Sequence, residues 1–265
     1  MLVWKLVLTP ALIAGASLAG RRWGHAVSGW LVGLPLTSGP VAFFLAVERG
    51  PAFAAEASLG SLAGAIAEAA FCLAYAYLAR GSARALAGGT VAFALVATVL
   101  QRAMTSWLVA ALGAYVILAL VLWLMPRARA AVASSAPPRW DLPARMIVAT
   151  VLVLAITESA PMIGARVSGV LATFPVYAAI LTVFAHHGSA AAAIQVLRGL
   201  LWGLFGFASF FVILGALLER AGIVTAFVAA SAGALAVQAA SLRLALSSRS
   251  KCGTGLTLRR SEGVE

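Results

Sequence analysis

The chain has 265 residues, of which 63% are hydrophobic and only 10% are charged, and its net charge is +11 at pH 7. A soluble domain carries charge on about a quarter of its residues, so this composition excludes a soluble globular protein and predicts many passes through a lipid bilayer. The basic residues lie almost entirely between apolar runs, where membrane topology accounts for them, and we therefore expect no nucleic-acid partner.

Nine apolar segments follow one another along the chain, each suited to a membrane-spanning helix. They lie near residues 2–20, 24–47, 57–79, 85–101, 105–125, 144–160, 164–185, 199–218 and 222–246. The first segment resembles a secretory signal peptide, but Arg21 and Arg22 follow it directly, as in a stop-transfer flank, so we expect a retained helix. Only the short polar sequence QRAMT (101–105) separates the fourth segment from the fifth.

The positive charges favour this count. If all nine segments cross the membrane, one side carries Lys5, Arg49, Arg102, Arg166 and Arg220, and the other side carries the remaining fourteen of the nineteen basic residues. Because cytoplasmic loops are enriched in Lys and Arg, this asymmetry places the N-terminus outside and the C-terminus in the cytoplasm. The predicted location is the inner (plasma) membrane of a bacterium.

One short phrase occurs twice in the sequence. GHAVSGWLVGLP (24–35) and GARVSGVLATFP (164–175) share six of twelve positions and open the second and the seventh segment. Five crossings separate the copies, so they must point in opposite directions through the bilayer. The sequence therefore predicts an all-α bundle of about nine transmembrane helices, built from two inverted-topology four-helix repeats joined by a spacer helix.

The domain boundaries follow from this duplication. The first four-helix repeat takes residues 1–104, the spacer helix 105–125, a basic and proline-rich cytoplasmic linker 126–143, the second repeat 144–246 and a cytoplasmic tail 247–265. Inverted repeats are frequent in secondary transporters, in which the two halves meet near the bilayer midplane.

The second half resembles the GlpM-like family of small bacterial inner-membrane proteins. The resemblance is carried by Val167-Ser168-Gly169, Phe174-Pro175, the turn at Gly188 and Leu197-Arg198-Gly199. It implies a four-helix unit of a loosely defined, transport-related role, with no catalytic residue. The first half departs from this pattern, because Leu34 stands in the place of Phe174 and Gly60 in the place of Arg198.

Proline residues predict a break in the second and the seventh segment. Pro35 and Pro175 occupy the same position of the repeated phrase, and each removes a backbone donor inside an apolar run. The carbonyl groups freed there need partners, because lipid offers none. With Thr37 and Ser38 beside the first break and Tyr177 beside the second, these residues form a candidate solute or ion pathway. Kinks satisfied by neighbouring helices are the alternative.

Glu68 is the acidic residue nearest the centre of a predicted span. A charged side chain there costs about 2.5–3.5 kcal/mol on insertion scales, so Glu68 should face the bundle interior. Ser61, Gly64, Cys72 and Tyr75 share its helical face. We expect Glu68 and Ser61 in the pathway, with Glu68 coupling protons or binding a cation. The alternative is a neutral carboxyl group that bonds the backbone of a neighbouring helix.

Two further charged residues are candidates for the pathway. Glu158 lies near the outer end of the sixth segment, where it either lines an outer vestibule or is simply solvated. Arg198 precedes a long apolar run, either as an anion site or as a side chain anchored at the cytoplasmic surface.

The sequence predicts neither an enzyme nor a cofactor or metal site. His186 and His187 are adjacent, so they point about 100° apart on a helix and make a poor metal pair. Small-residue pairs such as Gly60-x-x-x-Gly64 allow close helix packing or association with a second copy of the chain. The expected partners are therefore lipid and a small solute or a proton, with a second subunit of a homodimer as the alternative use of the small-residue pairs. A secondary transporter or exporter is favoured; a non-transporting scaffold or regulatory subunit is the alternative.

Overall fold

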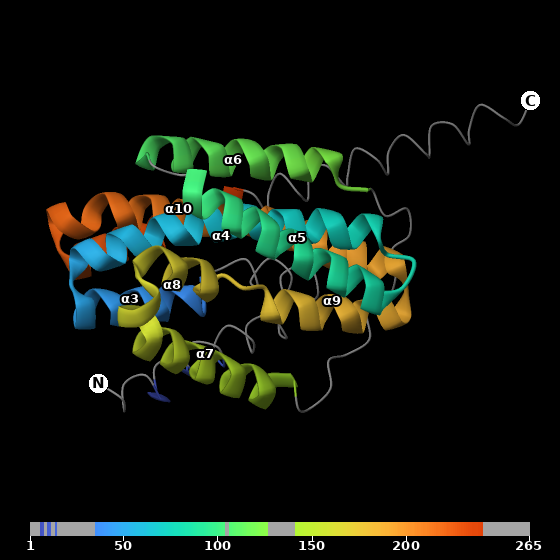
Figure 1. Ribbon diagram of the computed structural model, residues 1–265, viewed down its shortest axis with the longest axis horizontal. Coiled ribbons are helices and arrows are strands. Elements are labelled where there is room, and N and C mark those ends of the chain that lie inside the picture. The colour runs from blue at the N-terminus through green and yellow to red at the C-terminus, as the bar shows by residue number, and fades with distance from the viewer. Residues whose placement is uncertain are drawn as a thin grey trace, which may run out of the picture.

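The computed structural model describes residues 35–103, 106–126 and 141–240, together with positions 6, 7, 10, 11 and 14. Every regular element in this part of the chain is a helix, which confirms the all-α class (Figure 1). The helices are α3 (Ser38–Arg49), α4 (Pro51–Tyr77), α5 (Ser82–Ala103), α6 (Trp107–Leu124), α7 (Asp141–Ile163), α8 (Ala165–Ala172), α9 (Val176–Gly188), α10 (Ala190–Ala221) and a last helix, Ile223–Ala240. Most of the first copy of the repeated phrase, the linker and the tail lie outside the described residues.

Six helices of the described part of the chain are long and apolar enough to cross a membrane. They are α4, α5, α6, α7, α10 and the last helix, and they indicate a membrane-embedded bundle. The predicted division at QRAMT is confirmed, because α5 ends at Ala103 and α6 begins at Trp107. The count of nine crossings stays a prediction, since the described residues contain only part of the first two segments.

Several helix boundaries differ from the prediction. The seventh segment, 164–185, is two short helices, α8 and α9, rather than one span. Helix α10 begins at Ala190, well before residue 199, because the Ser189 hydroxyl accepts a hydrogen bond from the Ala192 amide and alanines continue the helix. Helix α4 begins at Pro51, where proline loses no helical hydrogen bond. Gly60 and Gly199 therefore lie inside their helices and not at the start.

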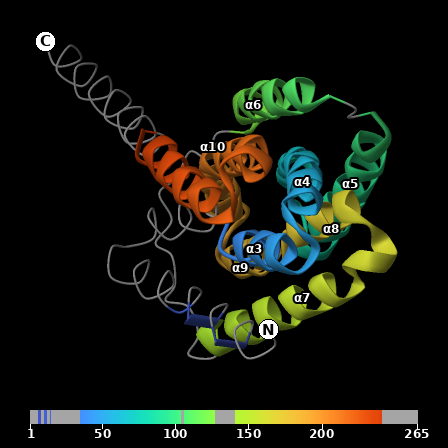
Figure 2. The ribbon, with the colours of Figure 1, turned by 90° about the vertical axis from the view of Figure 1, so that its left-hand side faces the viewer.

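Helices α4 and α10 form the centre of the bundle and run in opposite directions (Figures 1 and 2). At the end of α4, the Tyr77 hydroxyl donates to the carbonyl of Leu124 at the end of α6 (3.1 Å). Near the start of α10, Arg198 donates to the carbonyl of Met125 at the same end of α6 (3.0 Å). The end of α4 and the start of α10 therefore lie at one end of the molecule.

Helix α8 packs along α4, and α9 follows α8 in the same direction but packs mainly on α10. A Cβ atom added at Gly169 of α8 would overlap the carbonyl oxygen of Ala57, and one added at Gly64 would overlap the Thr173 hydroxyl group. Further along, the Tyr75 hydroxyl is 3.0 Å from Nδ1 of His186 on α9. Gly60 and Gly64 thus pack against α8 inside the chain, so they do not offer a free face to a second copy.

Helices α5 and α6 present apolar faces to the outside. The exposed side chains recur every four residues, as expected for one face of a helix in lipid. They are Val91, Leu95 and Val99 on α5, and Leu108, Leu112, Val116 and Leu120 on α6.

We call the end of the bundle that holds the turns at Gly50 and Gly222 the Gly50 end, and the end that holds the turns after Tyr77 and Gly188 the Gly188 end.

Candidate functional site

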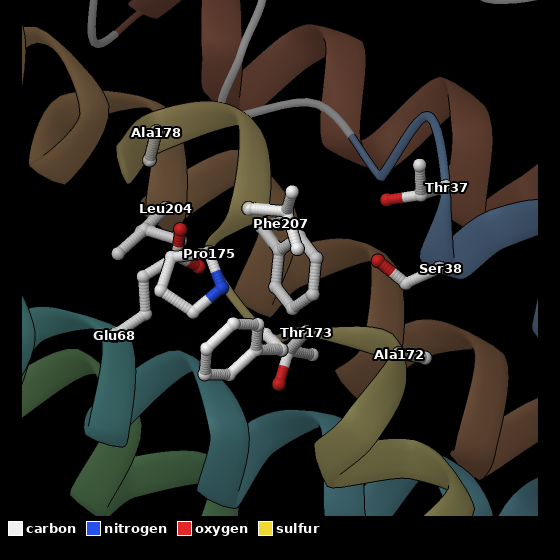
Figure 3. A pocket seen from close by; sticks show the side chains of 11 residues that line it. Thr37, Ser38, Glu68, Ala172, Thr173, Pro175, Ala178, Leu204 and Phe207 are labelled. Atoms are coloured by element: carbon white, nitrogen blue, oxygen red, sulfur yellow. The ribbon is translucent and has the colours of Figure 1, made fainter. Parts of the chain in front are cut away.

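A cavity of about 40 Å³ lies inside the bundle, where several interrupted helices meet (Figure 3). Its walls come from the start of α3, the second half of α4, the segment between α8 and α9, and the middle of α10. The lining residues are Thr37, Ser38, Glu68, Ala172, Thr173, Phe174, Pro175, Val176, Ala178, Leu204 and Phe207. This volume is enough for a few water molecules or a small ion, because one water molecule needs a cavity of about 10–15 Å³ on this measure.

The break between α8 and α9 forms one wall. Pro175 has no N–H group, so Leu171, four residues earlier, cannot receive the normal helical hydrogen bond from it. The Phe174 amide bonds the Leu171 carbonyl instead (3.2 Å), and the Val176 amide turns back to the Phe174 carbonyl (2.8 Å). This second bond is an inverse γ-turn centred on Pro175, with φ −79° and ψ 51°. The chain therefore crosses the cavity as a tight turn that holds α8 and α9 apart.

The first proline lies close to another wall. The described part of the first repeated phrase begins at Pro35, whose carbonyl accepts from the Gly39 amide (2.8 Å). Thr37 precedes α3 as its N-cap but makes no side-chain capping bond. The Thr37 and Ser38 hydroxyl groups are turned toward the interior (Figure 3), and both residues line the cavity. The residues that follow both prolines therefore meet at one place.

Glu68 supplies the only acidic group among the residues that line the cavity. Its side chain is 7% exposed, as its predicted position on the inner face of the helix requires. Figure 3 shows its carboxyl group directed toward the Pro175 turn from the side opposite Thr37 and Ser38. Within the described residues, no hydrogen bond or ion pair holds this carboxyl group. The alternative of a Glu68 that bonds a neighbouring backbone therefore finds no support in this part of the chain.

Two predicted site residues have structural partners away from the cavity. Ser61 is buried, and its hydroxyl donates to the carbonyl of Ala57 (3.2 Å) and reaches that of Gly169 (3.4 Å). Arg198 joins α10 to Met125 at the end of α6. Neither residue lines the cavity.

The remaining predicted residues lie apart from Glu68. Glu158 is exposed on α7, near the Gly50 end. Tyr177 belongs to α9, but the structure does not describe its side chain. Pro35 stands beside the cavity without lining it. Of the predicted residues, Thr37, Ser38, Glu68 and Pro175 are therefore brought together.

Sequence reasoning missed Thr173, Leu204 and Phe207. Thr173 immediately precedes Phe174-Pro175, so its place next to the break was the one usable signal. Leu204 and Phe207 come from an uninterrupted apolar run in α10 that has no local mark of a site. Across the described residues, no three His, Cys, Asp or Glu side chains are grouped so that they could hold a metal ion.

Comparison with protein-family models, with curated proteins and with solved structures gives no match for this chain.

Proposed function

We propose that this protein is a proton-coupled secondary transporter or exporter of a small solute in the bacterial inner membrane, and that Glu68 is its coupling residue. The observation that carries the proposal is the shared cavity: a buried carboxyl group, without a partner among the described residues, meets the residues that follow both prolines. An ionisable side chain at membrane depth is costly, and in transporters such residues mark ion and substrate paths.

The arrangement of the helices supports the inverted repeat on which this proposal rests. The predicted offset of about 140 residues pairs α3 with α9 and α4 with α10. The end of α4 and the start of α10 lie at the same end of the molecule, so α4 and its counterpart α10 are antiparallel. Figure 1 shows the same opposition between α3 and α9. Two halves with opposite directions that meet at one cavity are what alternating access requires.

The size of the cavity limits which solutes it can hold. In this conformation it accepts a water molecule, a hydrated proton or a small ion. A larger solute requires the cavity to widen. The hydroxyl groups of Thr37 and Ser38 and the carboxyl group of Glu68 would then face that solute together.

Reconstituted proteoliposomes test the proposal. A pH gradient and a membrane potential are imposed, proton movement is followed with a pH-sensitive dye inside the vesicles, and uptake of a panel of small solutes is measured. We expect wild-type protein to move protons and at least one solute, and Glu68→Gln to lose both by about tenfold or more, since one positioned proton-transfer group contributes a factor of this order at least. The matched control is Glu158→Gln, which removes an exposed carboxyl group.

Equal fluxes for wild type and Glu68→Gln would contradict the coupling role. An absence of any flux across the panel would favour the non-transporting scaffold or regulatory subunit. The GlpM-like resemblance remains a hypothesis in either case, since no comparison bears on it.

A further inference from the structure

Side chains of α4 and α9 meet at two places, the cavity and a pair of residues near the Gly188 end. On α4, Glu68, Cys72 and Tyr75 follow one another at helical spacing, and both Cys72 and Tyr75 are fully buried. The Tyr75 hydroxyl meets Nδ1 of His186 at 3.0 Å, two residues before the end of α9. His186 is only partly buried. A titratable ring thus stands at the end of this face, close to the surface of the protein.

The facing side of α9 carries a second series at four-residue spacing. Ala178 lines the cavity with Glu68, and His186 bonds Tyr75. Thr182 stands one helical turn from each, so it lies between the cavity and the Tyr75–His186 pair.

The Thr182 hydroxyl group is an unusual one in this bundle. It is fully buried, and it has no hydrogen-bond partner in the described part of the chain. Nine other Ser and Thr side chains donate to a carbonyl three or four residues back in their own helix: Ser58, Ser61, Thr98, Thr150, Thr157, Ser159, Ser168, Thr173 and Ser209. A buried hydroxyl group without a partner costs about 1–3 kcal/mol, and a bound water molecule removes that cost.

From this juxtaposition we infer that the facing sides of α4 and α9 form a proton path from the cavity to the Gly188 end, here called the inner path, in which water held by Thr182 connects Glu68 with Tyr75 and His186. The inference deepens the proposed function and rests on it. Water is required because Glu68 and Tyr75 are seven residues apart, which is about 10 Å along the helix axis at 1.5 Å per residue. Thr182 is a positioning residue in this path, and Tyr75 and His186 carry the proton.

The proton transfer balances at each step. Protonated Glu68 gives its carboxyl proton to the water, which passes one proton to the Tyr75 oxygen. The proton of the Tyr75 hydroxyl moves to Nδ1 of His186, in the tautomer that carries its own proton on Nε2. His186 then releases the Nε2 proton to the solution at the Gly188 end. Glu68 is left as a carboxylate, the water and Tyr75 keep their original number of protons, and the imidazole has changed tautomer.

The experiment measures potential-driven proton flux with the dye assay in proteoliposomes of the full chain. Thr182→Val keeps the shape of the side chain and removes the hydroxyl group, Tyr75→Phe removes the phenol oxygen, and His186→Gln keeps a hydrogen-bonding group that does not titrate. We expect each to lower the flux by about tenfold or more. Thr182→Ser restores the hydroxyl group and should restore the flux, which a purely structural role does not predict. Thr98→Val, at an exposed hydroxyl of α5, is the matched control.

Melting temperatures in detergent identify variants that fail to fold. If Thr182→Val is one of them, the flux of Thr182→Ser and His186→Gln still tests the path. Full flux in Thr182→Val and Tyr75→Phe, with flux lost in Glu68→Gln, would overturn the inner path and leave the proposed function standing. Equal flux in Thr182→Ser and Thr182→Val would also overturn the role of the hydroxyl group. A wild-type protein without proton flux would overturn the proposed function and the path together.

Discussion

At the scale of single residues, Glu68 differs from most of the other buried polar side chains that the structure describes. Buried hydroxyl groups such as those of Ser58 and Thr157 are satisfied by their own helix. Glu68 is equally buried but has no such bond, because a carboxyl group in α4 points into the cavity and away from its own backbone. A group that is costly to bury and makes no compensating bond lowers stability, and such groups are retained where they have a function.

This argument predicts the stability of a Glu68 variant. Glu68→Met keeps an unbranched side chain of similar length and removes the buried carboxyl group. We expect it to raise the free energy of unfolding by about 1–3 kcal/mol, the cost of an unsatisfied buried polar group. The measurement is the melting temperature in detergent at neutral pH.

Ser58→Ala is the matched control, because it also replaces a buried polar group of α4 by an apolar one. Since Ser58 is satisfied by Ala54, its loss should lower the free energy of unfolding by about 0.5–1.5 kcal/mol rather than raise it. A clear loss of stability in Glu68→Met would show that the carboxyl group has a structural partner.

At the scale of elements, α4 and α8 approach so closely that their backbones touch. Gly60 lies against the carbonyl of Arg166, and Gly169 against that of Ala57. The same pair of helices is joined at the Gly50 end by the ion pair between Arg166 and Glu56. Helix α8 is thereby held on α4, whereas α9 packs mainly on α10. The Pro175 turn therefore lies between a helix held by α4 and one held by α10.

Close packing of α8 on α4 predicts that Gly169→Ala is destabilising. The added methyl group meets a backbone carbonyl that cannot rotate away, so we expect a loss of about 1–3 kcal/mol in the free energy of unfolding. Gly113→Ala on α6 adds the same methyl group in open space and should not lower stability. Equal melting temperatures for the two variants in detergent would mean that the backbones of α4 and α8 do not pack this closely.

The Pro175 turn predicts that replacing this proline lowers the proton flux. Pro175→Ala supplies the missing N–H group and allows α8 and α9 to join as one helix, which removes a cavity wall. We expect proton flux in proteoliposomes to fall by about tenfold, because a displaced group no longer meets its partner. Pro161→Ala is the control, since Pro161 is exposed inside α7 and away from the cavity. Unchanged flux in Pro175→Ala would separate the turn from the function.

At the scale of the whole molecule, the two ends of the bundle differ in charge. Among the described residues, Glu48, Glu56, Glu158 and Glu219 all lie toward the Gly50 end, where they offset Arg49, Arg102, Arg166 and Arg220. Arg80, Arg84 and Arg198 lie toward the Gly188 end. Because Lys and Arg are retained on the cytoplasmic side, we infer that the Gly188 end faces the cytoplasm.

Labelling of single cysteines in intact cells tests this orientation. In a chain that carries Cys72→Ala and Cys252→Ala, Ser106→Cys at the Gly50 end should react with a membrane-impermeant thiol reagent. Gly81→Cys, in the turn after α4, should react only after permeabilisation. Arg22→Cys, at the first copy of the repeated phrase, should behave like Gly81→Cys if the repeats are inverted. Labelling of Arg22→Cys from outside would contradict the inverted topology.

The sequence by itself determined the features that depend on local chemistry. Apolar composition required helices in lipid, the polar QRAMT sequence separated α5 from α6, the missing N–H group of Pro175 interrupted the seventh segment, and the cost of a membrane-buried charge placed Glu68 inside. Each of these follows from residues that are neighbours in the chain.

Only the tertiary structure decided which of these features meet. That Thr173 stands against Gly64, that Leu204 and Phe207 line the Glu68 cavity, and that His186 reaches Tyr75 all depend on helices about 100 residues apart in sequence. It also shows that Ser61 and Arg198 make contacts with other helices and do not line this cavity. Helical periodicity tells which side of a helix is apolar or polar, but it does not tell which helix packs there. Many pairs of apolar faces are equally favourable. The small residues at one contact allow two backbones to touch, and this selects one pair.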